Sequence, residues 1–180
     1  MTPVLDTHGF SLHYDLHGDG EPLLFLHGGL GAGDNWMHIF GAPPAGYRLI
    51  APDQRGHGAS TNPSPVLTFR QIAADTLALL DHLQIDRVKA IGVSGGGIAL
   101  LHMATAQPAR IEAMVVVSAP PYFPSQARVV MRQASPSMFG DVEMERMRAR
   151  HRYGDAQIEQ LIACTRAFAD SYDDVAFTPP

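Results

Sequence analysis

The sequence predicts an α/β protein with a doubly wound, mostly parallel sheet and a helical cap. The first observation is a set of short, mainly apolar runs, such as residues 23–26 and 88–93; the first of these is wholly apolar, which is typical of a strand buried on both faces. The second is the helical spacing of apolar side chains over residues 69–83, between two of these runs. Strand, helix and strand in this rhythm indicate βαβ units with right-handed crossovers.

Each expected element has its own signal in the chain. Residues 11–17 alternate polar and apolar side chains, as in a half-buried strand. Thr68 is a suitable N-cap for the helix that follows it, and a buried helix is expected over residues 98–106. The strands are expected at residues 11–17, 23–26, 48–51, 88–93 and 113–117.

Composition disfavours several classes of function. The 180 residues carry 13 Lys and Arg against 18 Asp and Glu, so the net charge of −5 offers no footprint for nucleic acid or an anionic membrane. The single cysteine, Cys164, excludes an internal disulfide and a cysteine-based zinc site. No motif requires a metal or another cofactor, and the expected partner is a small-molecule substrate. Because no signal peptide or membrane span is indicated, the expected location is the cytoplasm.

Proline-rich composition divides the chain after residue 120. We expect three parts: residues 1–120 as the N-terminal part of the core, 121–176 as a helical cap or lid, and 177–180 as the start of a link. Two helical patterns lie within the cap, at about 142–153 and 155–172. Gly154 between them is an expected C-terminal helix cap.

The pattern G-x-S-x-G occurs where an apolar strand meets a buried helix. Gly92, Ser94 and Gly96 occupy its three defined positions. A sharp turn there would expose the serine hydroxyl, and small residues on both sides let the strand and helix backbones approach closely. This context predicts a nucleophilic serine. The alternative is a glycine-rich turn that binds a phosphate at the helix N-terminus.

A second glycine-rich turn follows the strand at residues 23–26. It consists of His27-Gly28-Gly29-Leu30, and its glycines free backbone N–H groups to point at a ligand. With the N–H of Gly95, these donors could form an oxyanion hole, which stabilises the negative oxygen formed when a serine attacks a carbonyl. The alternative is a plain turn that ends a strand.

A third motif, residues 53–60 (DQRGHGAS), follows the next strand. With the two glycine-rich turns in this order and spacing, the chain resembles the α/β-hydrolase fold superfamily, in its serine-nucleophile branch. The resemblance covers residues 12–180 and is much more specific for the superfamily than for any substrate. It implies that Ser94 is the nucleophile and that the N–H groups of Gly29 and Gly95 hold the oxyanion.

The resemblance also implies structural roles around the site. Asp53 and Arg55 are expected to hold their loop by charge and hydrogen bonds. His57 is not at the position of the family's catalytic histidine. The remaining residues of the motifs, with structural roles, are His27, Gly28, Gly92 and Gly96.

The family pattern places an acid and then a histidine after the nucleophile, and neither is recognisable here. His102 is expected to pack within its helix and His151 to lie on a solvated helix face. We therefore expect a hydrolase without its C-terminal third, nearly inactive alone, because a serine hydroxyl is a weak nucleophile without a base. An open edge at residues 113–117 would favour self-association or a complementing C-terminal segment.

The cap is expected to cover Ser94 and to help bind the substrate. The expected substrate-binding residues are Leu30, Trp36, Phe123 and Met138, and ordinary packing is the alternative for the tryptophan and the methionine. By the resemblance, a serine nucleophile favours esterases, lactonases, C–C bond hydrolases and perhydrolase-like enzymes over the branches that use aspartate. The alternative function is a catalytically incompetent fragment or a non-enzymatic binding module that keeps the fold's pocket.

Overall fold

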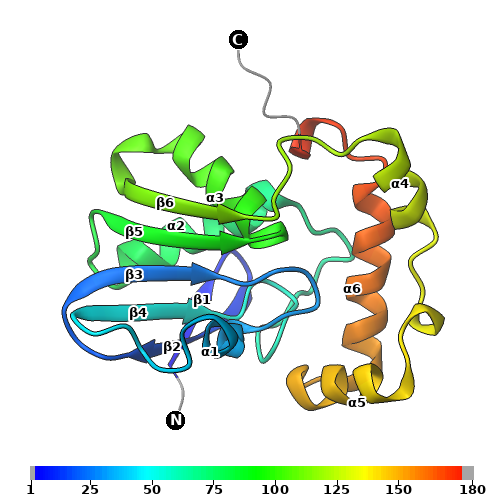
Figure 1. Ribbon diagram of the computed structural model, residues 1–180, viewed down its shortest axis with the longest axis horizontal. Coiled ribbons are helices and arrows are strands. Elements are labelled where there is room, and N and C mark those ends of the chain that lie inside the picture. The colour runs from blue at the N-terminus through cyan, green and yellow to red at the C-terminus, as the bar shows by residue number, and fades with distance from the viewer. Residues whose placement is uncertain (1–2, 176–180) are drawn as a thin grey trace.

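A computed structural model describes residues 3–175, which contain one six-stranded sheet in the order β1-β2-β4-β3-β5-β6 (Figure 1). The strands are β1 (Val4–Thr7), β2 (Phe10–His17), β3 (Glu21–Leu26), β4 (Tyr47–Pro52), β5 (Val88–Val93) and β6 (Ile111–Val117). Strand β3 pairs in parallel with β4 and β5, and β5 pairs in parallel with β6. The antiparallel strands β1 and β2 extend one edge. The mostly parallel α/β sheet is thus confirmed.

Strand β1 has no counterpart among the expected elements. It pairs with β2 from Val4 opposite His13 to Thr7 opposite Phe10, and its side chains are exposed or half-buried. Gly9, with a φ of +77°, helps to close the tight turn between the two strands. Four residues are too few to show a period of two, so the sequence pattern alone did not indicate this strand.

Two long helices, α2 (Phe69–His82) and α3 (Gly95–Ala106), pack over one face of the sheet. Thr68 caps α2 as expected: its hydroxyl accepts from the Gln71 N–H at 3.1 Å, and the Gln71 side chain accepts from the Thr68 N–H at 2.9 Å. The apolar side chains between these helices and the sheet form the main core, which includes Leu24, Ile50, Leu79, Leu80, Ile98 and Leu100.

The opposite face of the sheet has a much smaller helical cover. The 3-10 turn η1 (Gly33–Trp36) and α1 (Met37–Phe40) pack Trp36 against Phe25 and Leu49 of β3 and β4. Strand β6 lies at the far edge, where Met114, Val115 and Val117 are 41%, 55% and 42% exposed. Within the described chain, this edge and part of its face therefore have no covering element.

The segment after β6 is helical and stands beside the carboxyl ends of the parallel strands (Figure 1). Its helices are α4 (Ser125–Arg132), α5 (Asp141–Arg150) and α6 (Gly154–Phe168), and the other 3-10 turns are η2 (Pro108–Arg110), η3 (Pro136–Met138) and η4 (Asp173–Val175). The sequence pattern did not indicate α4, because prolines crowd this stretch. Gly154 is not the cap of α5: α5 ends at Arg150, and Gly154, with a φ of +66°, begins α6.

Among the helices of residues 3–175, none combines the length and the apolar character that crossing a membrane requires. The expected link at residues 177–180 lies outside the described residues.

Candidate active site

Ser94 occupies the turn between β5 and α3 with an unusual backbone conformation. Its φ is +50° and its ψ is −118°, a region that residues with a side chain rarely adopt. Backbone contacts enforce this conformation: the Ser94 N–H donates to the Val117 carbonyl at 2.7 Å, and its own carbonyl accepts from the Ile98 N–H at 3.1 Å. Such strain persists only where surrounding structure holds it, and it concentrates at functional sites.

Glycines around Ser94 allow the backbones to approach more closely than side chains would permit. A Cβ at Gly92 would lie 2.7 Å from the Gly96 carbonyl oxygen. A Cβ at Gly96 would collide with the carbonyl oxygens of Leu26 and His27. Any larger residue at either position would therefore push α3 away from β3 and β5.

The turn after β3 lies directly against Ser94. A Cβ at Gly28 would be 3.3 Å from the Ser94 Cβ, and the Gly29 nitrogen is 3.7 Å from the position a Cβ would take at Gly95. No hydrogen bond within residues 3–175 uses the Gly29 N–H. The Gly95 N–H begins α3, where no intrahelical acceptor exists. Two unused backbone donors are therefore neighbours beside the serine.

His27 fixes this turn to the loop that follows β4. The ring is fully buried; Nδ1–H donates to the Gly28 carbonyl at 2.8 Å, and Nε2 accepts from the Gln54 backbone N–H at 3.0 Å. Burial lowers the pKa of His27 to about 4, so the ring is neutral near neutral pH. A neutral ring is also what the two hydrogen bonds require, since one nitrogen must accept.

Asp53 follows β4 directly, and its side chain hydrogen-bonds to the loop after β3 and to the loop after β4. One carboxylate oxygen accepts from the Gly33 N–H at 2.7 Å and the other from the Ala59 N–H at 2.8 Å. Gly58, with a φ of +54°, packs so closely that a Cβ there would collide with the Asp53 carboxylate. These contacts fix the position of residues 53–60 at the carboxyl edge of the sheet.

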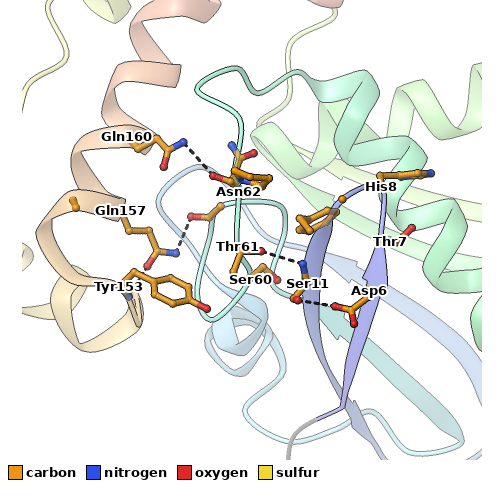
Figure 2. A pocket seen from close by; sticks show the side chains of 15 residues that line it. Asp6, Thr7, His8, Ser11, Ser60, Thr61, Asn62, Tyr153, Gln157 and Gln160 are labelled. Carbon is orange, nitrogen blue, oxygen red and sulfur yellow. Dashed lines mark hydrogen bonds between the residues drawn. The ribbon is translucent and has the colours of Figure 1, made fainter.

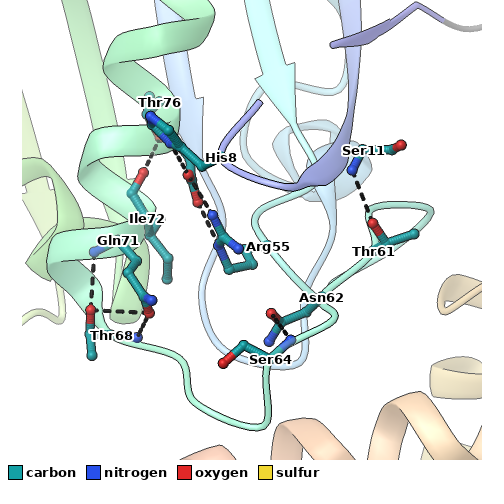
Figure 3. Close-up of polar contacts among 11 residues, drawn as sticks. His8, Ser11, Arg55, Thr61, Asn62, Ser64, Thr68, Gln71, Ile72 and Thr76 are labelled. Carbon is teal, nitrogen blue, oxygen red and sulfur yellow. Dashed lines mark hydrogen bonds and ion pairs between the residues drawn. The ribbon is translucent and has the colours of Figure 1, made fainter. Parts of the chain in front are cut away.

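Arg55 joins the same loop to α2 through a buried ion pair. Its guanidinium donates twice to the Asp75 carboxylate, at 2.8 Å each, and the two side chains are only 6% and 2% exposed. The guanidinium also lies 3.9 Å from the centre of the Phe10 ring, and the His8 ring lies 2.7 Å from the same carboxylate (Figure 3). Neither Asp53 nor Arg55 lines the cavity at Ser94.

A cavity of about 260 Å³ opens at Ser94, between the core and the cap. Gly28, Gly29, Leu30 and Gly95 line this cavity together with Ser94. Its other walls are mostly apolar, and they include Leu67, Phe69, Ile72, Ile98, Phe123, Met131, Leu161 and Phe168. The cap thus contributes part of the cavity wall.

Two of the expected substrate-binding residues are elsewhere. Trp36 is buried with Phe25 and Leu49 on the opposite face of the sheet, because the turn after Gly31 carries η1 around to that side. Met138 belongs to η3 and is 55% exposed. Met131, on the unexpected helix α4, is the methionine that reaches the cavity. Leu30 and Phe123 line the cavity as expected.

His151 is not on a solvated face, as its helical pattern suggested. It is 1% exposed, Nδ1 accepts from the Gly58 N–H at 3.0 Å, and Nε2–H donates to the Leu30 carbonyl at 3.2 Å. Arg150 donates to the same carbonyl at 3.1 Å. His151 follows the last residue of α5, so its ring leaves the helix surface and attaches the cap to both loops at the site.

His102 packs within α3 as expected, and it has a partner that the sequence did not indicate. Its ring Nε2–H donates to the Asp174 carbonyl oxygen at 2.6 Å. The Asp174 carboxylate accepts from the N–H groups of Phe69 and Arg70, at 2.6 and 3.1 Å, at the start of α2. This contact attaches the end of the described chain to both long helices, and a negative charge there is favourable.

No side chain within residues 3–175 is hydrogen-bonded to the Ser94 hydroxyl. The same part of the chain holds no group of three or more histidine, cysteine or acidic side chains suited to a metal ion. Within the described residues, Ser94 therefore has neighbouring donors for a negative oxygen and no proton acceptor hydrogen-bonded to its hydroxyl.

A second, more open cleft of about 670 Å³ lies between the β1–β2 turn, the loop after β4 and α6 (Figure 2). Its polar side chains bond to their own surroundings. The Ser11 hydroxyl donates to the Asp6 carboxylate at 2.6 Å, and Gln157 and Gln160 each donate to backbone carbonyls of residues 56–64 at 2.8 Å. This cleft marks where α6 is attached to the core, and Ser94 does not line it.

The folded chain should lose stability as the pH falls below about 6.5, the pKa of histidine in an unfolded chain. Burial lowers the pKa of His27 to about 4 and also lowers those of His57 and His151. Below the pKa that these histidines have in the unfolded chain, the unfolded chain binds more protons than the folded chain. Stability therefore falls as the pH falls from 6.5 toward the folded-state pKa values. Each of these three histidines contributes up to about 1.4 kcal/mol per pH unit to the pH dependence of the free energy of unfolding.

Urea unfolding of wild type and His151→Asn at several pH values measures this slope. Asparagine keeps an acceptor for the Gly58 N–H and cannot take up a proton. Below about pH 6.5, the free energy of unfolding of the variant should depend less steeply on pH than that of the wild type. The difference in slope should be at most the contribution of one proton. Above that pH the two slopes should agree. Identical slopes over the whole range would show that His151 does not resist protonation in the folded chain.

The sheet order, the strained serine turn and the paired backbone donors define a protein of the α/β-hydrolase class with a serine at its strand-to-helix turn. The chain belongs to the alpha/beta hydrolase fold family, whose model matches residues 21–142.

Known relatives agree with this assignment. The chain is 39% identical over 127 residues to a non-heme chloroperoxidase of Streptomyces lividans, covering 67% of this chain and 45% of that protein. It is 36% identical over 118 residues to an epoxide hydrolase 2 of Siraitia grosvenorii, covering 64% and 37%. A solved hydrolase from Pseudomonas aeruginosa PA01 superposes with a TM-score of 0.74 at 25% identity, over 95% of this chain and 73% of that one. The chain thus spans less than half the length of the two curated relatives.

Proposed function

We propose that this chain carries the nucleophile of a serine hydrolase for small esters or related carbonyl compounds. In this mechanism the Ser94 hydroxyl gives its proton to a base and attacks the substrate carbonyl. The C–O bond to the alcohol of the ester then breaks, the alcohol leaves with that proton, and an acyl-enzyme remains. The N–H groups of Gly29 and Gly95 bind the oxygen as it becomes negative, and water then releases the acyl group.

One observation carries the proposal: a strained serine beside two unused backbone donors. The Gly29 nitrogen lies within 3.7 Å of the Cβ position at Gly95, and both residues line the cavity at Ser94. Donors preorganised in a partly buried site stabilise a developing oxyanion more than donors in water do. A phosphate-binding turn would use the same helix N-terminus, but it would not require the serine backbone to be strained.

The cavity supports the proposed substrate class. Its volume of about 260 Å³ and its mostly apolar walls suit a small acyl group. A serine can form and release an acyl ester, which favours carbonyl substrates over the epoxides that the name of one relative indicates.

The mechanism requires a general base, and residues 3–175 do not place one at the Ser94 hydroxyl. We propose that a complementing C-terminal segment supplies the base and its orienting acid. Loss of the histidine from a serine triad costs about a million-fold in turnover, so residues 3–175 alone should react slowly.

Labelling with a fluorophosphonate and mapping the adduct by mass spectrometry tests the assignment of Ser94. Because no base within the described chain is hydrogen-bonded to Ser94, we expect labelling to be slow, with the adduct on Ser94, and to fall to background in Ser94→Ala. Ser118→Ala is the matched control, because Ser118 is an exposed serine at the end of β6 with a φ of +53°. Equal labelling of wild type and Ser94→Ala would show that the proposed nucleophile is wrong.

Because no base within residues 3–175 is hydrogen-bonded to Ser94, a second candidate is a binding module that keeps the cavity without turnover. This candidate predicts background labelling of wild type while small ligands still bind in the cavity. Labelling and ligand binding, measured on the same preparation, therefore separate the two functions.

A further inference from the structure

Among residues 3–175, four polar side chains line the cavity at Ser94: Gln54, His57, Ser94 and Thr165. The Thr165 hydroxyl donates to the Leu161 carbonyl within α6, at 3.1 Å. Gln54 and His57 come from one short turn, in which the His57 N–H donates to the Gln54 carbonyl at 2.8 Å. Both are nearly inaccessible from outside, at 4% and 5% exposure.

The amide group of Gln54 uses its NH₂ donor in a hydrogen bond and leaves its oxygen acceptor unpaired within the described chain. The side-chain NH₂ donates to the His27 carbonyl at 2.5 Å, which identifies the other terminal atom as the oxygen. Within residues 3–175 this oxygen has no hydrogen-bond partner, yet it is not among the buried atoms without one. The oxygen therefore reaches accessible space, and the cavity is the space that Gln54 lines.

His57 has the same arrangement. Its Nδ1 lies 3.0 Å from the Arg55 carbonyl, which can only accept, so Nδ1 carries the proton. Nε2 is then an acceptor, and by the same reasoning it is accessible and unpaired within the described chain. Burial, with the neighbouring His27 ring 4.9 Å away, lowers the pKa of His57 well below its usual value, so the ring stays neutral. A protonated ring would lose this acceptor.

Two unpaired acceptors thus lie in the same small cavity as the two unused donors at Gly29 and Gly95. A buried acceptor loses water when an apolar ligand enters, and it recovers that loss only if the ligand donates a hydrogen bond. A carbonyl compound that also bears an O–H or N–H group would satisfy both sets of groups.

We infer that Gln54 and His57 form an acceptor subsite in the Ser94 cavity, which selects small carbonyl compounds that carry an O–H or N–H donor. This inference deepens the proposed function and rests on it for the carbonyl part of the ligand. The subsite itself needs no turnover, so it can be tested by binding alone.

Phenol and fluorobenzene are suitable probes, because they have nearly the same shape and only phenol has a donor. Binding is measured by NMR titration in the Ser94→Ala chain, which removes the serine hydroxyl as a competing acceptor. We expect phenol to bind roughly threefold to tenfold more tightly than fluorobenzene, the range for one neutral hydrogen bond. Equal affinities, or no saturable binding of phenol, would overturn the subsite.

Variants assign the preference to the two side chains. His57→Asn keeps a donor for the Arg55 carbonyl and withdraws the Nε2 acceptor, so the preference for phenol should decrease. In the double variant Gln54→Leu/His57→Asn it should disappear. His151→Asn is the matched control, since the same substitution there affects a buried histidine that does not line the cavity. A full preference in the double variant would overturn the inference.

Fluorophosphonate labelling keeps the two proposals distinguishable. Labelling reports only on the reactivity of Ser94, and the binding titration lacks that hydroxyl. A phenol preference without labelling would support the subsite and contradict the nucleophile. Labelling of Ser94 without a preference for phenol would support the nucleophile and contradict the subsite.

Discussion

Replacing Arg55 by methionine should destabilise the folded chain by about 3–5 kcal/mol, the cost of leaving one charge of a buried pair unpaired. The Asp75 carboxylate is 2% exposed and receives both of the arginine's hydrogen bonds at 2.8 Å. His8 also contacts this carboxylate but is half exposed, so it compensates only in part. Urea unfolding at neutral pH, followed by circular dichroism, measures the change.

Two further variants test whether the unpaired charge is the cause. Arg132→Met removes a surface ion pair between side chains that are 46% and 70% exposed, Arg132 and Asp170, and should cost much less stability than Arg55→Met. The double variant Arg55→Met/Asp75→Leu removes both buried charges and should recover most of the lost stability. If Arg55→Met is no more destabilising than Arg132→Met, the buried pair is not what holds the loop to α2.

Lysine at both Val115 and Val117 should suppress self-association of the chain. We propose that the free edge and face of β6 associate with another β6 edge or a complementing segment, because an uncovered edge strand offers unpaired N–H and C=O groups. The register with β5 puts Val115 and Val117 beside Ile91 and Val93, on the face turned away from α2 and α3. Charges placed there oppose pairing with a second copy.

Sedimentation velocity at a series of concentrations measures this effect. We expect oligomers of wild type and an association at least about tenfold weaker for the double lysine variant. The matched control is Val129→Lys/Val130→Lys, since these valines are 53% and 56% exposed but lie on α4. A monodisperse wild-type monomer at all concentrations would contradict the proposal.

Local patterns were sufficient for most of the core. Mainly apolar runs marked β3 and β5, and Thr68 with the spacing of Ile72, Leu77 and Leu80 marked α2. Such signals succeed because strand burial and helix amphipathicity are repeated over many residues. They failed for β1 and α4, since one has only four residues and the other lies among prolines.

The sequence likewise predicted one part of the candidate site and not the rest. Glycines at fixed spacing around Ser94 indicated the turn, because only residues without a side chain allow the backbones to approach so closely. Which side chains complete the cavity was harder to predict. Trp36 and Met138 were expected there and lie elsewhere, while Met131 lines the wall.

The amino-acid sequence by itself determined the family, the parallel sheet and the position of the strained serine, because these depend on short-range spacing along the chain. Only the tertiary structure decided that His151 is a buried attachment of the cap and that Gln54 and His57 have free acceptors. These properties depend on which atoms meet across the fold: the Gly58 N–H and Leu30 carbonyl for one residue, and the His27 and Arg55 carbonyls for the others. A histidine or a glutamine has the same letter whether its hydrogen bonds are satisfied or open to a ligand, and only the surrounding atoms distinguish the two cases.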